Sequence, residues 1–331
     1  MDVCGTLKKT SISFIRTDKM KDPKIVATSR IPFEKLTPIH PNRRIMLEIG
    51  QIPIAPRLID LFVPIGFGQR ALVVSPPKAG KTTILRQIAA AVLQNYPDAS
   101  LFLCLVDERP EEVTEWRMEV QGPGVKLYAS SFDQQSARHG RIVDQALNDA
   151  KRLVEEGNDV VILLDSLTRL ARAHNLSSDM WSGPRNQRGN YGSRTLSGGI
   201  DAHALEVGRR VFGAARTIEE GGSLTIVASC LVETGSRLDE VVYEEFKGTG
   251  NLEIRLSREL ADRRIFPAVD LAASSTRQEE RLLSPSELRA MAILRRKLAD
   301  LPRREITEQV IGLLEKTRSN AQLVEAVLKQ G

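Results

Sequence analysis

A phosphate-binding loop is the strongest chemical signal in the sequence. Residues 75–82 read Ser-Pro-Pro-Lys-Ala-Gly-Lys-Thr, the GxxxxGK[ST] pattern with serine at the first glycine position. In such loops, backbone N–H groups at a helix start cradle phosphates, the lysine reaches the terminal phosphates, and the last hydroxyl holds Mg²⁺. An apolar run precedes the loop and helical periodicity follows it. This context argues against an accidental match and predicts that Lys81 and Thr82 bind ATP and Mg²⁺.

Two carboxylates follow apolar runs further along the chain. Asp165 ends the run Val160–Leu164, where nucleotide-binding folds carry an acid that supports Mg²⁺; the alternative is a helix N-cap. Glu108 lies in an Asp-Glu-Arg-Pro turn after Ser100–Val106, at the edge where parallel sheets bind ligands. Spacing alone does not decide whether Glu108 orients an attacking water or is simply part of a charged turn. Three arginines are further candidates for phosphate contacts, although any single arginine is more often a surface residue: Arg169, Arg172 and Arg277.

Strands and helices must alternate to position these side chains. Unbroken apolar runs predict buried strands, and amphipathic stretches between them predict helices on both faces of a mostly parallel sheet, an α/β fold. The expected strands are Arg70–Ser75, Ser100–Val106, Lys126–Ser131, Asp159–Leu164 and Ser223–Leu231. The expected helices are Thr82–Leu93, Glu111–Val120, Ser136–Glu155, Leu167–Asn175 and, near the C-terminus, Pro285–Ala299, Glu305–Lys316 and Ala321–Lys329.

Composition narrows the class of protein. The chain has 331 residues, 41% hydrophobic and 27% charged, which is ordinary for a globular enzyme and excludes disorder as its main state. No apolar run approaches the roughly 18 residues of a membrane span, and no secretory pattern is present. Three cysteines and four histidines lie far apart, so neither a disulfide framework nor a zinc site is expected, and a reducing cytoplasm fits best. The net charge of +5 permits a nucleic-acid partner without requiring one.

Several short strings along the chain form a recognisable set. They begin at the following residues: Leu36 (LTPIH), Pro64 (PIGFGQR), Pro76 (PPKAGKT), Asp107 (DERPEEVT), Leu164 (LDSLTRLAR), Phe212 (FGAAR), Glu219 (EEGGSLT), Tyr243 (YEEFKGTG) and Arg264 (RIFPA). Together these strings resemble the bacterial transcription termination factor Rho family. The resemblance runs from about Pro32 to the C-terminus and implies a RecA-like P-loop NTPase domain with C-terminal helices, a homohexameric ring, ATP hydrolysis between subunits, and single-stranded RNA drawn through the central hole.

The resemblance implies a role for each residue of the nucleotide site. Glu108 takes the place of the residue that polarises the attacking water, Asp165 that of the Mg²⁺-linked acid together with Thr82, and Arg169 that of an arginine coupling subunits. Arg277 takes the place of the finger supplied by the neighbouring subunit, and Phe266 that of the adenine-stacking residue. The remaining nucleotide contacts implied are Lys78, Ala79, Gly80, Lys81, Thr82, Thr83 and Arg109, with a second segment of Gly66, Phe67, Gly68, Gln69, Arg70 and Ala71.

Two pore loops that contact RNA are also implied. The stretch 176–198 matches the first loop and the turn Glu233–Arg237 matches the second. The contacting residues implied are Arg194, Thr195, Ser197 and Gly199 in the first loop, and Thr234, Gly235, Ser236 and Arg237 in the second. The first loop is longer than the family pattern, and arginine replaces the expected lysine at positions 194 and 237. RNA polymerase or a full-length relative stays open as a further partner.

The chain is expected to divide into four parts. Residues 1–30 are a vestigial N-terminal segment in place of the family's RNA-capture domain, and the proline-rich residues 31–69 are an extended linker. Residues 70–283 are the RecA-like ATPase domain, and residues 284–331 are a C-terminal helical subregion. The leading hypothesis is an ATP-dependent RNA translocase. The alternatives are a nucleotide- and RNA-binding regulator that does not terminate transcription, or another RecA-like ring ATPase, such as a rotary or protein-export subunit.

Overall fold

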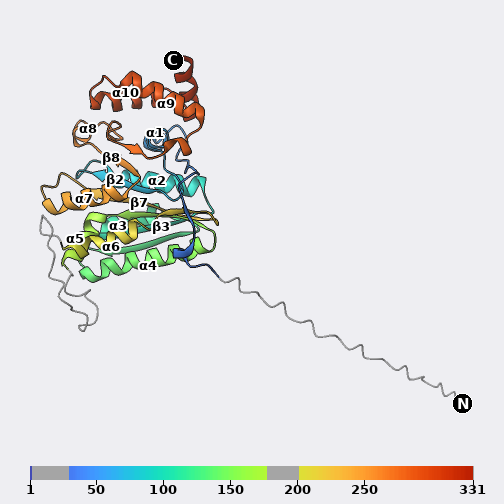
Figure 1. Ribbon diagram of the computed structural model, residues 1–331, viewed down its shortest axis with the longest axis vertical. Coiled ribbons are helices and arrows are strands. Elements are labelled where there is room, and N and C mark those ends of the chain that lie inside the picture. Colours follow the sequence, from blue (N-terminus) through green and yellow to red (C-terminus); the bar gives the residue numbers. More distant parts are fainter. Residues whose placement is uncertain (2–29, 177–200, 331) are drawn as a thin grey trace. The chain divides into compact units, whose positions relative to one another are not determined.

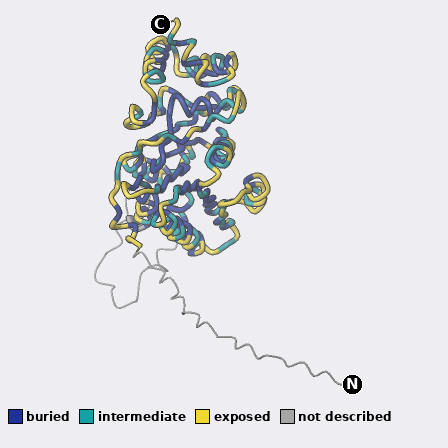
Figure 2. Tube along the Cα trace, turned by 90° about the vertical axis from the view of Figure 1, so that its right-hand side faces the viewer, coloured by how far each residue is buried: buried dark blue, intermediate teal, exposed yellow. Residues whose placement is uncertain are grey.

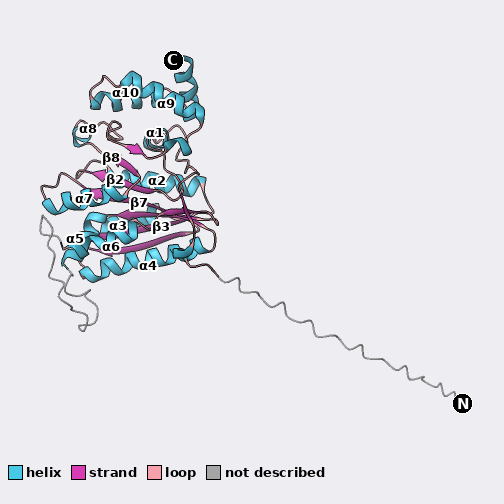
Figure 3. Ribbon diagram, viewed as in Figure 1, coloured by secondary structure: helices cyan, strands magenta, loops and turns pink. Residues whose placement is uncertain are grey.

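The structure is a computed structural model that describes Met1, residues 30–176 and residues 201–330. Contacts divide the chain into residues 1–30 and 31–331, and the second unit carries the sheet and its helices. The sheet has the strand order β4-β3-β5-β7-β2-β8-β9. Figures 1 and 3 label β3, β7, β2 and β8 within it. The parallel strands are β2 (Arg70–Ser75), β3 (Ser100–Glu108), β4 (Val125–Ser131), β5 (Asp159–Asp165), β7 (Ser223–Leu231) and β8 (Leu252–Arg255). The antiparallel strands are β1 (Pro38–Ile39), β6 (Arg216–Ile218) and β9 (Ser275–Thr276).

Two hydrophobic layers sandwich this sheet, because successive side chains of a strand point to opposite faces. In β2, Leu72 and Val74 join one buried cluster, whereas Ala71 and Val73 join the other. Figure 2 shows the buried residues gathered in the middle of the fold. The first layer is built with helices α4 (Ser136–Glu155), α5 (Leu167–Leu176), α6 (Ala202–Phe212) and α7 (Arg237–Thr249).

The opposite layer contains both the loop-bearing helix and the C-terminal helices, which therefore share one core. It is built with α1 (Ile54–Phe62), α2 (Lys81–Asn95), α3 (Pro110–Glu119), α9 (Pro285–Leu298), α10 (Arg303–Glu315) and α11 (Asn320–Gln330). The short elements η1 (Phe33–Lys35), α8 (Arg258–Asp262) and η3 (Glu279–Arg281) complete the fold. Within the described ranges, no helix is both long and apolar enough to cross a bilayer.

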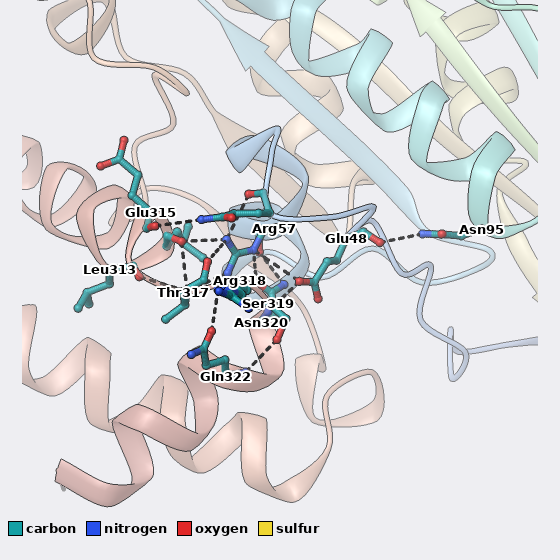
Figure 4. A network of polar contacts seen from close by, with 12 residues as sticks. Glu48, Arg57, Asn95, Leu313, Glu315, Thr317, Arg318, Ser319, Asn320 and Gln322 are labelled. Carbon is teal, nitrogen blue, oxygen red and sulfur yellow. Dashed lines mark hydrogen bonds and ion pairs between the residues drawn. The ribbon is translucent and has the colours of Figure 1, made fainter.

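A buried guanidinium ties the C-terminal helices to α1 (Figure 4). Arg57 is 0% exposed, and all three of its side-chain nitrogens donate hydrogen bonds. The acceptors include the carbonyl of Leu314 at 2.8 Å, the hydroxyl of Thr317 at 2.9 Å and the amide oxygen of Asn320 at 3.2 Å. Glu48 lies 3.5 Å from the guanidinium and accepts the backbone N–H of Asn320. The turn between α10 and α11 is therefore part of the core.

The structure confirms all five strands and all seven helices expected from the sequence, with shifts of one or two residues at some ends. It corrects one expectation of irregular backbone and adds two helices that were not expected. The segment 31–69 is not extended throughout, because α1 forms within it: Pro53 occupies the N-cap and Pro56 lies in the first turn, where the missing N–H breaks no helical bond. The polar stretch 233–250 contains α7, whose Val242 and Phe246 are buried on one face. Helix α6 was not expected either.

Candidate active site

The candidate site lies at the C-terminal ends of four adjacent strands, β3, β5, β7 and β2. We call this side of the sheet the loop edge, and the side at the N-terminal ends of these strands the opposite edge. The phosphate-binding loop leaves β2 after Ser75, and α2 begins at Lys81. Gly80 has φ +94°, a left-handed conformation that glycine adopts without steric cost. Lys78, with φ +65°, also turns left-handed. The loop therefore has a strained, specific path, as a phosphate cradle requires.

Four of the charged side chains predicted for the nucleotide site lie together at the phosphate-binding loop. Lys81 Nζ is 2.5 Å from Asp165 Oδ1, and the Ser229 hydroxyl donates to the same oxygen at 2.8 Å. Arg169 Nη2 is 3.1 Å from Glu108 Oε1 and donates through its other terminal nitrogen to the carbonyl of Asp107. Strand order brings these groups together, because β5 lies between β3 and β7.

Glu108 has the electrostatics of a group that can exchange a proton. Its side chain is 1% exposed, and its Oε2 has no hydrogen-bond partner among the described residues. Burial, followed by repulsion from Asp165, raises the pKa of Glu108 to about 7, although Arg169 and Lys81 oppose the shift. A carboxyl with a pKa near neutrality and an unpaired oxygen is suited to general base chemistry.

An apolar cavity of about 480 Å³ adjoins the start of α2. Phe266 lines it and is 47% exposed, which leaves a ring face free for stacking. Ala79, Gly80 and Thr83 line the cavity on the loop side. The sequence predicted those four residues, but it missed the wall formed by Ile52, Ile54 and Ala55. The only available signal for that wall was an apolar pattern inside a proline-rich stretch.

The residues expected at a Mg²⁺ site fit that ion. Thr82 lies next to Lys81 in the first turn of α2. Asp165 supplies a buried carboxylate that is paired with the Lys81 ammonium. Across the described part of the chain, no group of three or more His, Cys, Asp or Glu side chains could hold a metal alone. One hydroxyl and one carboxylate suit Mg²⁺, which keeps several waters and takes further oxygens from phosphates.

The segment Gly66–Ala71 does not join the phosphate-binding loop. It lies at the start of β2, roughly 17 Å from Ser75 at the usual rise of a strand. Asn251 connects this segment to Arg277, because its side-chain oxygen accepts the Arg70 N–H at 2.8 Å and its carbonyl accepts the Arg277 N–H at 2.9 Å. The structure therefore brings Gly66–Ala71 together with Arg277 at the edge of the sheet opposite the loop.

Arg277 is exposed at this opposite edge, where it lines a small cavity of about 160 Å³ with Lys247 and Glu253. Within one chain it cannot reach a nucleotide on the phosphate-binding loop. Gly68 in the same region is required by packing, since a Cβ there would lie 2.2 Å from the Thr217 hydroxyl. Two residues expected at the nucleotide, Lys78 and Arg109, are exposed near the loop edge.

The turn expected to contact RNA connects β7 to α7, at the loop edge of the sheet. The Thr234 hydroxyl donates to Asp239 at 2.6 Å, and Arg172 binds the same carboxylate. Gly235 has φ +76°, Ser236 is the N-cap of α7, and Arg237 is exposed at its first position. The other predicted RNA contacts lie outside the described residues: Arg194, Thr195, Ser197 and Gly199.

Comparison with known proteins assigns the family. Residues 56–276 match the nucleotide-binding domain of the ATP synthase alpha/beta family. The chain is 49% identical to the transcription termination factor Rho of Streptosporangium roseum over 92% of its own length and 80% of that protein. The chain belongs to the transcription termination factor Rho family. The Rho factors of Rhodopirellula baltica (49% identity, 90% of the chain) and Micrococcus luteus (51%, 93%) match it over 56% and 42% of their lengths. It thus spans about half the length of these relatives.

Solved structures show the fold. An ATPase from the type III secretion system of pathogenic bacteria superposes with a TM-score of 0.71 at 21% identity, over 89% of this chain and 86% of that one. The assembled ATPase EscN from enteropathogenic E. coli gives 0.67 at 20% identity, over 88% and 72%. The fold is that of a RecA-like P-loop NTPase, as expected from the sequence. The chain is 49% identical to the Rho factor of Rhodopirellula baltica but only 21% identical to the type III secretion ATPase, so it belongs with the Rho factors rather than with the secretion ATPases.

Proposed function

We propose that this chain is an ATP-dependent translocase of single-stranded RNA, which hydrolyses ATP at the subunit interfaces of a hexameric ring. The observation that carries the proposal is Glu108, buried with one unpaired oxygen beside the Lys81–Asp165 pair. A buried unpaired carboxylate oxygen is costly to the fold, and here it stands next to a phosphate-binding loop. In the hydrolysis of a phosphoanhydride, that oxygen can accept a proton from the attacking water.

The side chains divide the chemistry between them. Lys81 leaves Asp165 and neutralises charge on the terminal phosphates, while the loop N–H groups hold the phosphate oxygens. Mg²⁺ bound by Thr82 and Asp165 would supply charge neutralisation between the phosphates. Glu108 accepts a proton from the attacking water at Oε2, while Arg169 holds its other oxygen.

Arg277 supports hydrolysis between subunits. Because it lies at the opposite edge of the sheet from its own loop, it serves a nucleotide only in a neighbouring chain. A repeated head-to-tail contact of this kind closes into a ring when its rotation allows. Among the structural neighbours, EscN is an assembled ATPase. Within the segment Gly66–Ala71 only Arg70 is partly exposed, so Arg70 would then face the neighbour's nucleotide with Arg277.

The RNA part of the proposal rests on the turn before α7 and on family membership. Arg237 is exposed at the loop edge and suits a phosphate backbone, as Arg194 does by its type. The turn is tied to α5 through Arg172 and Asp239, and α5 also carries Arg169. RNA contact and the hydrolysis site are thus linked through one helix. A chain working on nascent RNA would act in the cytoplasm.

The test is the rate of ATP hydrolysis with and without single-stranded RNA. The proposal expects stimulation by RNA and complete loss of both rates in Lys81→Ala, which should keep the circular dichroism spectrum of the parent. An RNA-indifferent rate would favour a ring ATPase that acts on another substrate. RNA binding with no hydrolysis under any condition would favour a regulator that binds nucleotide and RNA without moving along it.

A further inference from the structure

A buried histidine lies beside Asp107, the residue that precedes Glu108, and is outside the set of residues that the family resemblance assigns to the nucleotide site. His139, on the first turn of α4, is 3% exposed. Its Nδ1 is 2.7 Å from the Ser130 hydroxyl at the end of β4, and its Nε2 is 3.8 Å from the carboxylate of Asp107 in β3. Three elements of the fold therefore meet at one imidazole ring, one residue away from Glu108.

The hydrogen-bonding pattern fits a neutral ring in one tautomer. Burial lowers the pKa of His139, although Asp107 opposes the shift. A neutral imidazole has one donor and one acceptor nitrogen. The Ser130 oxygen accepts the backbone N–H of Asp107 at 3.4 Å, which leaves its own hydrogen for Nδ1. The Nε2–H then faces the Asp107 carboxylate.

This arrangement holds Asp107 in an unusual backbone conformation. Asp107 has φ +55°, which is uncommon for a residue with a side chain, and the pairing of β3 with β4 is irregular between Leu105 and Glu108. Such an irregularity re-aims side chains next to functional sites. Here it turns the Asp107 carbonyl toward Arg169, the same guanidinium that holds Glu108 Oε1. His139 and Ser130 contact Asp107, Asp107 contacts Arg169, and Arg169 contacts Glu108.

A serine, a histidine and an aspartate in contact also raise the possibility of a nucleophilic triad. Burial argues against that role, because Ser130 is 1% exposed and a substrate cannot reach its hydroxyl. Among the described residues, the polar contacts of the ring are with Asp107 and Ser130, and none is with the phosphate-binding loop. The group is placed to fix backbone geometry rather than to react.

We propose that His139 and Ser130 are positioning residues for ATP hydrolysis: they fix Asp107 so that Arg169 and Glu108 keep the alignment that presents Glu108 Oε2 to water. The proposal rests on the hydrolytic role given to Glu108 above. It predicts an effect on the chemical step alone, because in the described part of the chain the polar contacts of His139 are with Ser130 and Asp107, and neither residue lines the apolar cavity. A small misplacement of a reacting group costs about 10²-fold in rate.

The test uses the full chain, with kcat, KM for ATP and thermal unfolding measured for a set of variants. His139→Ala should lower kcat roughly 10- to 100-fold and leave KM within about twofold. His139→Asn, which keeps a polar atom near Ser130, should recover part of the rate. Ser130→Ala removes one hydroxyl and should lower kcat in the same direction, which keeps the proposal testable if His139→Ala does not fold. His40→Ala, at an exposed histidine, is the matched control and should change neither constant.

The decisive comparison is made in a Glu108→Gln background. If His139 acts through Glu108, His139→Ala should not lower the residual rate of Glu108→Gln any further, because linked residues are not additive. An equal fold loss in both backgrounds, a matching rise in KM, or parent activity in both His139→Ala and Ser130→Ala would overturn the proposal. If Glu108→Gln itself keeps the parent rate, the role of Glu108 fails, which is a separate result.

Discussion

Two buried clusters of charge in this molecule are built in opposite ways. Around Arg57, every guanidinium nitrogen is hydrogen-bonded, mostly to carbonyl and amide oxygens of the turn between α10 and α11 (Figure 4). At the loop edge, Glu108 keeps an unpaired buried oxygen, and Asp107 and Lys78 adopt left-handed backbone. Satisfied buried groups stabilise a fold, whereas unpaired groups and strained backbone persist where a ligand or a reaction uses them. We interpret the first cluster as structural and the second as functional, and variants of each should separate stability from chemistry.

The largest effect on the rate of ATP hydrolysis is expected for Arg277→Ala and Lys81→Ala, tested separately and in rings that contain both variants. Arg277→Ala should lower hydrolysis on the order of 10³-fold, as expected for a finger supplied in trans. Lys81→Ala alone should be inactive. Mixed rings of the two variants should recover part of the activity, because some interfaces then combine an intact loop with an intact Arg277. Absence of recovery in rings shown by mass spectrometry to be mixed would place the whole site within one chain.

Removal of the structural guanidinium should cost stability rather than chemistry. Arg57→Met keeps the approximate length of the side chain but leaves buried carbonyls and Glu48 without their donor, so the free energy of unfolding should fall by about 3–5 kcal/mol. Urea unfolding measures the loss. Lys329→Met is the control, because that lysine pairs with Glu325 on an exposed helix face and should cost less than about 1 kcal/mol. If Arg57→Met costs no more than this control, the cluster is not a structural lock.

The raised pKa of Glu108 predicts a pH dependence of stability. In the folded protein without nucleotide this pKa is about 7, against 4.5 for an unperturbed group, so the folded state holds a proton that the unfolded state releases between these values. Stability should therefore fall as pH rises from 4.5 to 7, by at most about 3 kcal/mol from this group. The free energy of unfolding, measured by chemical denaturation at pH 5 and pH 8, should therefore differ less between the two pH values in Glu108→Gln than in the parent. Equal differences in both proteins would mean that folding does not raise the pKa of Glu108.

The smallest effect is expected at the RNA turn. Arg237→Ala should reduce the slope of log affinity against log salt by about one phosphate contact for a single-stranded RNA, as measured by fluorescence anisotropy. Basal ATP binding should stay unchanged, because Arg237 does not line the apolar cavity. An unaltered slope would show that this arginine does not contact the phosphate backbone.

The sequence predicted the parts of the fold that depend on local pattern. The apolar run before the loop, the loop itself and the amphipathic helices that follow β2, β3, β4 and β5 are all encoded within short windows, and the structure confirms these strands and helices. Helix α1 escaped prediction because its prolines suggested extended backbone, although Pro53 and Pro56 lie where a helix tolerates them. Helix α7 escaped because the glycines that flank it resemble those of a loop.

Which residues meet across the fold was harder to predict. The resemblance assigned both Gly66–Ala71 and Lys81 to the nucleotide site, and the structure adds that they lie at opposite ends of β2 within one chain. Strand length and direction alone could have revealed this separation. His139 had no predicted role among four scattered histidines, because the contact with Ser130 and Asp107 depends on the order β4-β3-β5, which the sequence does not display.

The most direct test of the functional cluster is Glu108→Gln, studied for ATP binding, turnover and stability together. The amide keeps the shape of the side chain but cannot accept a proton from water. A fluorescent ATP analogue should bind as in the parent, turnover should fall on the order of 10³-fold, and stability near neutral pH should not be reduced. Hydrolysis at the parent rate would exclude Glu108 as the proton acceptor. A loss of stability comparable to that of Arg57→Met would instead assign Glu108 to the structural cluster.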